Sequence, residues 1–273
     1  MAAHGEAGRD RTAGRPTSWD PVQYARFSYH RSRPFFELVG RIHCQDPVSV
    51  VDLGCGSGEL TATLAARWPG ARILGVDHSQ PMLDRAAAHA GERVTFVSAD
   101  LGSYLPDPAT EVVLSNAAYQ WVDGHPAVLE RIARQRPPGG WLAVQLPGNF
   151  RSPSHRLIRE VLALPRWQQA TGGVLLREDP VLEPVGYADL FAAAGLVPDV
   201  WETTYSQVLA GADPVLEWVK GTALRPVLGA LPDRLHQDFL AELGGRLRRA
   251  YPARPYGTVF GFRRIFAVGR RPD

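Results

Sequence analysis

A glycine-rich segment, residues 52–58, reads Asp-Leu-Gly-Cys-Gly-Ser-Gly and follows a β-branched run. Glycine lets a backbone turn through positive φ and approach a ligand closely. The segment lacks the Gly-Lys-Ser/Thr ending of a P-loop. Glu59 stands where the dinucleotide fingerprint has its third glycine. Asp52, next to the loop, is a poor partner for a pyrophosphate, so we expect the loop to bind a cationic ligand that carries an amino group.

Three further polar residues follow predicted strands. Asp77 comes 25 positions after Asp52, Asp100 follows the next β-rich run, and Asn116 ends the run after that. A carboxylate at the end of the second strand of such a unit accepts hydrogen bonds from the hydroxyls of a ribose. Hydrogen bonds to a charged group contribute about 1.5–3 kcal/mol. We therefore expect Asp77 to bind a ribose.

The elements that must position these residues are alternating strands and helices. Strands are predicted at residues 48–53, 72–77, 94–97, 111–116 and 141–146, and helical patterns separate several of them. Such alternation predicts a doubly wound α/β fold with a mostly parallel sheet covered on both faces. Ligands bind beyond the carboxyl ends of the strands in these sheets.

The second half has a different pattern. Residues 151–195 have a helical pattern, residues 197–209 and 258–268 predict two long strands, and apolar residues recur every fourth position over 235–251. We expect the two strands to complete a seven-stranded sheet with an antiparallel last strand, and the helices to form a cap. The predicted organisation is a disordered tail (1–18), a ligand-binding core with an N-terminal arm (19–150), and a second part (151–273) that completes the sheet with residues 197–209 and 258–269 and carries the cap.

The ordered set of motifs resembles the class I S-adenosylmethionine-dependent methyltransferases. The glycine loop matches their first motif, Asp77 their ribose-binding acid, and Asp100 the acid that meets the adenine amino group. Asn116 and the turn at residues 137–141 (Pro-Pro-Gly-Gly-Trp) also match. The resemblance implies a Rossmann-like fold and S-adenosyl-L-methionine as the cofactor. The residues it assigns to the cofactor are Asp52, Gly54, Gly56, Gly58, Asp77, Asp100 and Asn116.

A narrower similarity is to the members of this family that methylate a carboxylate of trans-aconitate. It extends over residues 19–270 and rests on the segments 19–24, 31–34, 116–121, 142–147, 200–205 and 221–226. It implies an O-methyltransferase that forms a monomethyl ester. A carboxylate has a pKa of about 4 and is already ionised at neutral pH, so we expect no catalytic base.

The acceptor implied by this resemblance is a small carboxylate substrate, and arginine binds carboxylates through paired hydrogen bonds. Arg33 and Arg225 lie in family-like segments and are our main candidates, followed by Arg31 and Arg177. Further candidates for the pocket wall are Tyr24, Gln120, Trp121 and Tyr205, with His125 as a candidate donor to the substrate.

Composition excludes several other functions. The net charge of +2 gives no reason to expect nucleic-acid binding. No apolar run is long enough to span a membrane, the histidines lack metal-ligand spacing, and two cysteines indicate a cytoplasmic protein without a disulfide framework. Two alternatives stay open: a methyltransferase for another acid, a phenol or an amine, and a non-catalytic protein that binds S-adenosylmethionine. The oligomeric state is not predicted.

Overall fold

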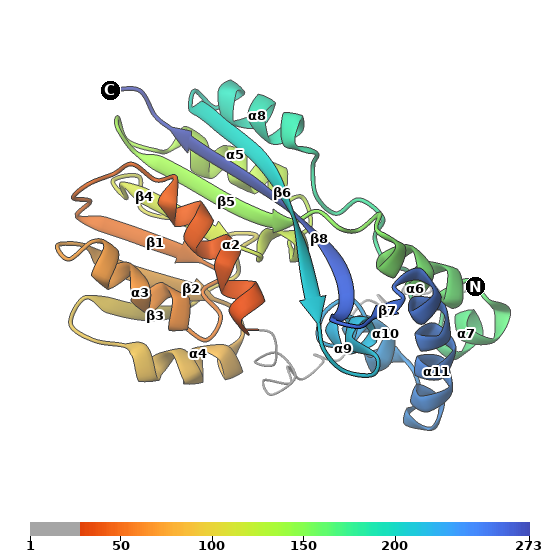
Figure 1. Ribbon diagram of the computed structural model, residues 1–273. Coiled ribbons are helices and arrows are strands. Elements are labelled where there is room, and N and C mark those ends of the chain that lie inside the picture. The colour runs from red at the N-terminus through yellow and green to blue at the C-terminus, as the bar shows by residue number, and fades with distance from the viewer. Residues whose placement is uncertain (1–27) are drawn as a thin grey trace, which may run out of the picture.

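The computed structural model describes residues 28–273. The predicted tail (1–18) and the arm residues 19–27, with the candidate Tyr24, lie outside the described residues. The described chain forms one mixed sheet, its helices, and a helical cap beside one end of the sheet (Figure 1).

The sheet confirms the predicted doubly wound fold. Its strand order is β3-β2-β1-β4-β5-β8-β6, and a short β7 pairs with β8. The first five strands are parallel: β1 (Ser49–Leu53), β2 (Arg72–Asp77), β3 (Val94–Ser98), β4 (Val112–Asn116) and β5 (Trp141–Pro147). The antiparallel strands are β6 (Val197–Leu209), β7 (Ala253–Arg254) and β8 (Gly257–Arg270).

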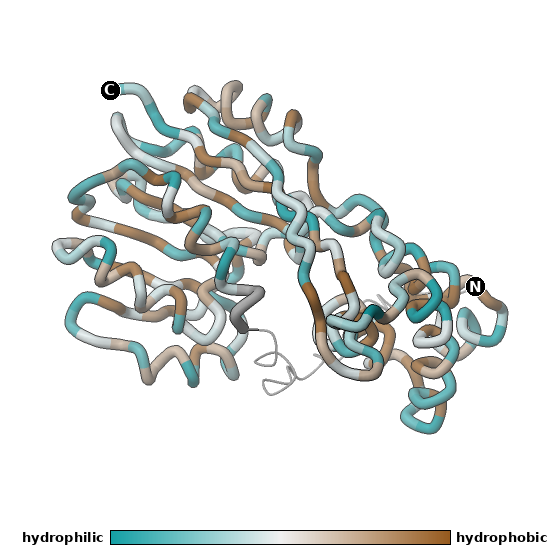
Figure 2. The backbone as a smooth tube through the Cα atoms, in the orientation of Figure 1, coloured by the Kyte–Doolittle hydropathy of each residue, from teal (hydrophilic) through white to brown (hydrophobic). Residues whose placement is uncertain are grey.

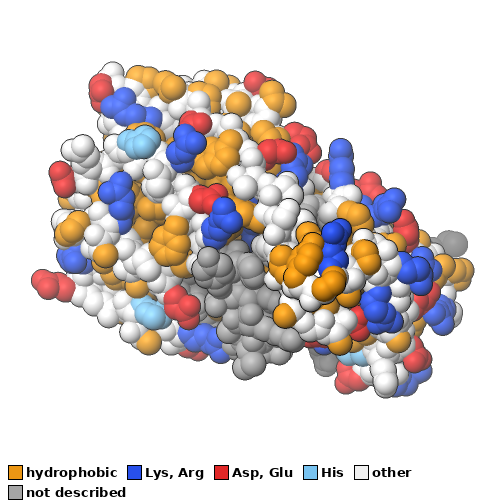
Figure 3. All heavy atoms as spheres, in the orientation of Figure 1, with side chains coloured by type: hydrophobic (Ala, Val, Ile, Leu, Met, Phe, Trp, Pro, Cys, Tyr) orange, Lys and Arg blue, Asp and Glu red, His pale blue; other side chains and the backbone are white. Residues whose placement is uncertain are grey.

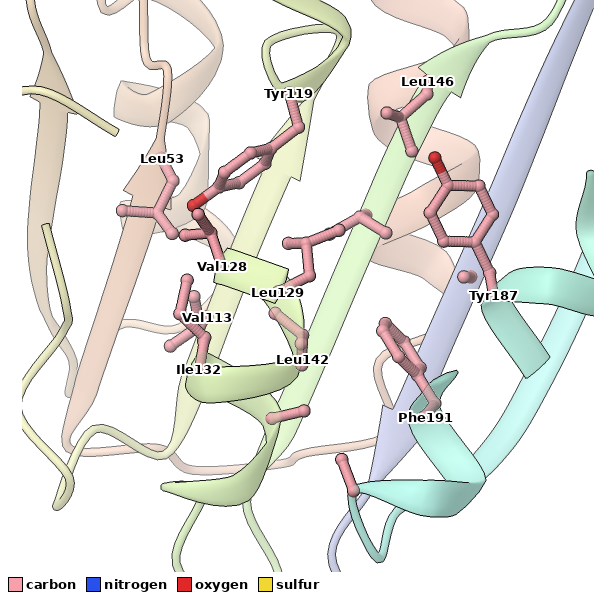
Figure 4. Packing of buried hydrophobic residues seen from close by; sticks show 14 of the residues in the cluster. Leu53, Val113, Tyr119, Val128, Leu129, Ile132, Leu142, Leu146, Tyr187 and Phe191 are labelled. Carbon is pink, nitrogen blue, oxygen red and sulfur yellow. The ribbon is translucent and has the colours of Figure 1, made fainter. Parts of the chain in front are cut away.

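The central strands are apolar because helices cover both faces of the sheet. Residues 112–115 of β4 and 141–146 of β5 are all buried. One face packs on α5 (His125–Arg134) and α8 (Pro184–Ala193), as Figure 4 shows for Leu129 and Phe191 against the strands. The opposite face packs on α2 (Ser28–Gly40) and α3 (Glu59–Arg67).

The remaining helices of the core connect neighbouring strands. α4 (Gln80–Ala86) and the 3₁₀ turn η1 (Ala87–His89) join β2 to β3. A second 3₁₀ turn, η2 (Tyr119–Trp121), follows β4. This turn is important for the site because it lies directly after the carboxyl end of a central strand.

The cap has its own apolar core, formed around the far ends of β6 and β8. Both strands run past the end of the parallel strands into the helical part (Figure 1). The cap helices are α6 (Pro153–Leu162), α7 (Pro165–Ala170), α9 (Pro214–Lys220), α10 (Arg225–Ala230) and α11 (Asp233–Ala250). Apolar segments lie along the strands and on the inner sides of the cap helices (Figure 2). Residues 171–183, which we expected to be helical, instead form turns and irregular chain.

The surface of the cap carries both signs of charge. Figure 3 shows basic and acidic side chains interspersed over it, and Arg166–Glu242 and Arg248–Asp213 are among its ion pairs. No helix within residues 28–273 has both the length and the apolar character needed to cross a membrane.

Candidate functional site

The polar residues predicted from the sequence lie along one edge of the sheet. The adjacent strands β3, β2, β1 and β4 end near Asp100, Asp77, Gly54 and Asn116, respectively. These strands are parallel, so their carboxyl ends meet at the same edge. The tertiary structure thus brings residues more than 60 positions apart into one row.

The glycine loop approaches the turn after β4 closely. Gly54 has φ 84°, and a Cβ atom on it would lie 2.2 Å from the Cβ of Ala118. Ala117 has φ 55°, a left-handed conformation that is uncommon for a residue other than glycine. Its backbone N–H donates to the carbonyl of Gln145 at 2.8 Å, which supports this conformation. The missing Cβ of Gly54 therefore allows the loop after β1 to approach the turn after β4, and the Ala117 hydrogen bond joins that turn to β5.

Asp77 organises the middle of the glycine loop. Its Oδ2 accepts a hydrogen bond from the backbone N–H of Gly56 at 2.9 Å, and its Oδ1 accepts one from Ser79 N–H at 2.9 Å. A carboxylate has about four acceptor positions, so further positions are left for ligand hydroxyls. Gly56 has φ 56°, and a Cβ atom there would meet no heavy atom within 4 Å. The loop therefore has open space at Gly56, next to a carboxylate that can accept further hydrogen bonds.

Asp52 lies beneath the loop, with only 3% of its surface exposed. Its Oδ2 accepts a hydrogen bond from the hydroxyl of Thr61 in α3 at 2.6 Å. The pKa of Asp52 is raised to about 6, chiefly by burial; the Thr61 hydrogen bond opposes this shift, and the charge of the nearby Asp77 adds to it. A cation bound beside this carboxylate would favour its ionised form.

Asp100 and Asn116 lie at the two ends of the row. Asp100 is exposed after β3, and its Oδ1 accepts a hydrogen bond from the backbone N–H of Gly102 at 3.0 Å. Asn116 ends β4, and its buried Oδ1 has no hydrogen-bond partner within residues 28–273. A buried polar atom without a partner is costly, which makes Asn116 a candidate ligand contact.

Two acceptor candidates form one cluster with an acidic residue of α2. The hydroxyl of Tyr205 donates to Glu37 at 2.6 Å, and the Arg33 guanidinium donates to Glu37 at 2.8 Å. Arg33 also lies over the Tyr205 ring, 4.6 Å from its centroid. Arg33 and Tyr205 are thus adjacent, and Glu37 balances the charge of Arg33.

The other candidates are distributed around the site. Gln120 is buried in η2, where its Nε2 donates to the carbonyl of Ala117 at 2.6 Å and its Oε1 lacks a partner in the described chain. The neighbouring Trp121 is 59% exposed. Arg225 begins α10 in the cap, and partial burial lowers its pKa.

Arg177 and Arg31 are the remaining arginine candidates. Arg177 donates to Asp123 at 2.7 Å, and the side chain of Arg31 lies outside the described structure. The structure therefore pairs Arg177 with Asp123 and does not test the prediction for Arg31.

His125 lies in the core between α5 and α8, away from these candidates. It is 2% exposed, and its Nε2 lies 2.9 Å from the hydroxyl of Tyr187. Burial lowers the pKa of His125 to about 4, and the charge of Arg177 acts in the same direction. This contact is between two helices on the face of the sheet opposite α2 and α3.

Two buried polar residues that were not predicted from the sequence extend the row beyond Asn116. Gln145 on β5 is the register partner of Asn116, and Arg264 on β8 donates from Nη1 to Gln145 Oε1 at 3.4 Å. Strand alternation contains a signal for Arg264, because it replaces an apolar residue in the series Phe260, Phe262, Phe266. Among residues 28–273, no group of three or more His, Cys, Asp and Glu residues is arranged to hold a metal ion.

The sheet order and the glycine loop with its row of strand-end acids define a class I S-adenosylmethionine-dependent methyltransferase. A family model described as a methyltransferase domain matches residues 50–140. The chain is 49% identical over 269 residues to the trans-aconitate 2-methyltransferase of Streptomyces coelicolor (94% of this chain, 88% of that protein). It is 47% identical over 254 residues to that of Rhodococcus jostii (92% and 99%). The chain belongs to the trans-aconitate 2-methyltransferase family.

A solved structure supports the fold independently of these sequences. A methyltransferase from Geobacter sulfurreducens, in complex with S-adenosyl-L-homocysteine, aligns with a TM-score of 0.54 at 23% identity. The alignment covers 93% of this chain and 99% of that chain. It therefore includes both the sheet and the cap region.

The site residues fit the cofactor of this class, S-adenosylmethionine. The open space at Gly56 allows a ligand to approach the backbone, and Asp77 retains acceptor positions for ribose hydroxyls. The buried, partnerless Oδ1 of Asn116 in the described chain can accept a hydrogen bond from the ligand. Asp52 supplies negative charge under the loop.

Proposed function

We propose that the protein transfers the methyl group of S-adenosylmethionine to a carboxylate oxygen of trans-aconitate. The products are a monomethyl ester and S-adenosylhomocysteine. The observation that carries this proposal is the extent of the similarity to the curated relatives, which covers the cap as well as the core at 49% and 47% identity. The cap is the part of the chain in which an acceptor pocket would be built beyond the strand ends.

The residues assigned to the cofactor are those of the strand-end row. S-adenosylmethionine, when bound, supplies an electrophilic methyl group on a sulfonium. Asp77 holds the ribose, Asp100 meets the adenine amino group, and Asp52 provides charge for the amino end. Gly54, Gly56 and Gly58 shape the backbone, and all three have positive φ. Asn116 orients the ligand from the neighbouring strand.

Catalysis in this proposal consists of binding and alignment. The acceptor carboxylate is ionised at neutral pH, so no side chain has to remove a proton. Holding two reactants in line contributes about 7–11 kcal/mol to lowering a barrier. The protein would supply this by fixing the acceptor above the edge of the sheet and by excluding water.

Arg33, Tyr205 and Arg225 are the proposed cationic and polar contacts of the acceptor. Arg33 and Tyr205 are adjacent on α2 and β6, and Arg225 begins α10 in the cap. Gln120 and Trp121 would form the wall beside Asn116, and Tyr24 stays a prediction outside the described chain. His125 is left out of this set because its ring is engaged with Tyr187 in the core.

We also propose a cytoplasmic location and a small-molecule acceptor, with no nucleic-acid or membrane partner. The two cysteines, Cys44 and Cys55, are both free thiols, which suits a reducing compartment. Both reactants are small soluble metabolites.

Mass spectrometry of the product tests the proposed function. The protein is incubated with S-adenosylmethionine and trans-aconitate, with parallel reactions containing cis-aconitate, citrate, a phenol and an amine. A product heavier than trans-aconitate by one methylene, together with S-adenosylhomocysteine, is expected. Preferred turnover of another acceptor would assign a different substrate, and absence of turnover with every acceptor would favour a non-catalytic role.

A further inference from the structure

Arg264 occupies a position in the sheet next to the strand-end row. It is the register partner of Pro147 at the end of β5 and of Thr203 on β6. Asn116 and Gln145 are register partners on the neighbouring pair β4 and β5. Gln145 pairs in turn with Phe266, so Arg264 lies two strands across and two residues along the sheet from Asn116. With strands about 4.8 Å apart and a rise of about 3.3 Å per residue, their Cα positions are about 12 Å apart.

The Arg264 guanidinium is buried and held in a defined orientation. The residue is 6% exposed, and its guanidinium carbon lies 4.5 Å from the centroid of the Phe262 ring. Its Nη1 donates to Gln145 Oε1 at 3.4 Å. A buried arginine fixed by an aromatic ring and a neutral amide is suited to bind an anion through paired hydrogen bonds.

Gln145 adds a second donor beside this guanidinium. The residue is 1% exposed, and its Oε1 faces Arg264, which assigns the Nε2 end of the amide to the opposite side. This Nε2 has no hydrogen-bond partner within the described chain. A buried N–H donor without a partner costs free energy unless a ligand accepts from it. The pair therefore presents donors on adjacent strands, on the same side of the sheet as Asn116.

We propose that Arg264 and Gln145 form an anchoring subsite for a carboxylate of the acceptor. This inference rests on the proposed function and names residues for one part of it. The anchored group is a carboxylate that does not react, because about 12 Å along the sheet separates Arg264 from Asn116, at the donor end of the row. A second carboxylate of the same small acceptor then reaches the reacting position. By holding the first carboxylate, Arg264 and Gln145 fix where the second one lies.

The neighbouring arginine provides a matched control. Arg263 precedes Arg264 on β8, so its side chain lies on the opposite face of the sheet. There it forms ion pairs with Glu183, at the start of α8, and with Glu202 on β6. Replacing Arg263 removes the same charge from the same strand without changing the proposed subsite.

Steady-state kinetics and calorimetry on the full chain test the proposal. Arg264→Gln should raise the KM for trans-aconitate about 10- to 100-fold, the range expected for lost hydrogen bonds to a charged group. Its Kd for S-adenosylhomocysteine should stay within about twofold of the wild type. Arg263→Gln should leave both constants within about twofold. A normal KM in Arg264→Gln, with an active wild type, would overturn the subsite and leave the proposed function intact.

A second variant tests the subsite without removing the buried charge of Arg264. Gln145→Glu is nearly isosteric and places a carboxylate beside Arg264, which should pair with it and compete with the acceptor. We expect a folded protein that binds S-adenosylhomocysteine normally but binds trans-aconitate at least about tenfold more weakly. Unchanged binding of trans-aconitate by this variant would overturn the subsite. If the wild type itself neither binds nor methylates trans-aconitate, the proposed function fails, and the subsite fails with it.

Discussion

The carboxylate of Asp77 accepts a hydrogen bond from the backbone N–H of Gly56 at 2.9 Å. This contact joins the end of β2 to the middle of the glycine loop that follows β1. The carboxylate that we propose to bind the ribose therefore also fixes the backbone of the glycine loop. In this proposal, one side chain couples cofactor binding to the geometry of the loop.

Asp77→Asn should weaken binding of S-adenosylhomocysteine about 10- to 100-fold, because the amide replaces a charged acceptor with a neutral one. Isothermal titration calorimetry measures this change. The control is Asp84→Asn on α4, where an exposed carboxylate accepts a hydrogen bond from Gln80 at 2.8 Å. An unchanged dissociation constant in Asp77→Asn would contradict the ribose assignment.

Gly56→Ala should abolish most cofactor binding, because its methyl group would occupy the open space above the loop. Gly124, which precedes α5, is a matched control: it also has positive φ (67° against 56°), and a Cβ atom added to it would meet no heavy atom within 4 Å. Both substitutions carry a similar backbone cost of about 1 kcal/mol. Equal losses of cofactor affinity in the two variants, measured by calorimetry, would argue that Gly56 does not face the cofactor.

Cofactor affinity should fall as the pH decreases through 6. Burial raises the pKa of Asp52 to about 6, so the free protein takes up a proton there and loses the charge that favours a bound ammonium group. Affinity for S-adenosylhomocysteine should be constant above about pH 7 and fall up to about tenfold per unit below about 6. Calorimetry at about pH 5 to 8 measures this, and Asp52→Asn should flatten the profile.

The raised pKa of Asp52 has the opposite effect on the free energy of unfolding of the ligand-free protein, which should fall as the pH rises. A folded-state pKa above the unfolded value means that the Asp52 contribution to the free energy of unfolding is fully present below about pH 4 and is lost as the pH rises through 6. Denaturation of wild type and Asp52→Asn without ligand should therefore diverge as the pH rises. Parallel stability profiles would contradict the assigned pKa.

The kcat should be independent of pH between about 6 and 8 when both substrates are saturating. The acceptor needs no base, and burial lowers the pKa of His125 and of His155 to about 4, so both rings stay neutral over this range. Initial rates at saturating trans-aconitate and S-adenosylmethionine measure the profile. An inflection near about pH 6.5 would point to general-base catalysis by a histidine.

Tyr187→Phe should lower the free energy of unfolding by about 1–3 kcal/mol, because it removes the hydroxyl that faces the buried His125 ring. The KM for trans-aconitate should not change, since this contact lies in the core between α5 and α8. Urea denaturation and steady-state kinetics measure both quantities. Tyr256→Phe, at an exposed tyrosine, is the control, and a raised KM in Tyr187→Phe alone would return His125 to the acceptor site.

Local sequence predicted the parallel core because each element carried its own pattern. Glycines with positive φ marked the loop after β1, and Asp77, Asp100 and Asn116 each followed a short apolar strand. His125 was different. It lies near a predicted helix start, and only the packing of α8, whose Tyr187 is 62 residues further along the chain, places its ring in the core.

The sequence by itself determined the class of fold and predicted the residues for the cofactor, because the glycines and strand-end carboxylates lie within a few positions of the elements that carry them. Tertiary structure alone decided the neighbours of Arg264. Its strand inserts between β5 and β6, which are distant from one another in the chain, and this insertion places a buried guanidinium beside Gln145. Pairing between distant strands depends on the packing of the whole sheet, so strand alternation alone could mark this arginine as unusual but could not name its partner.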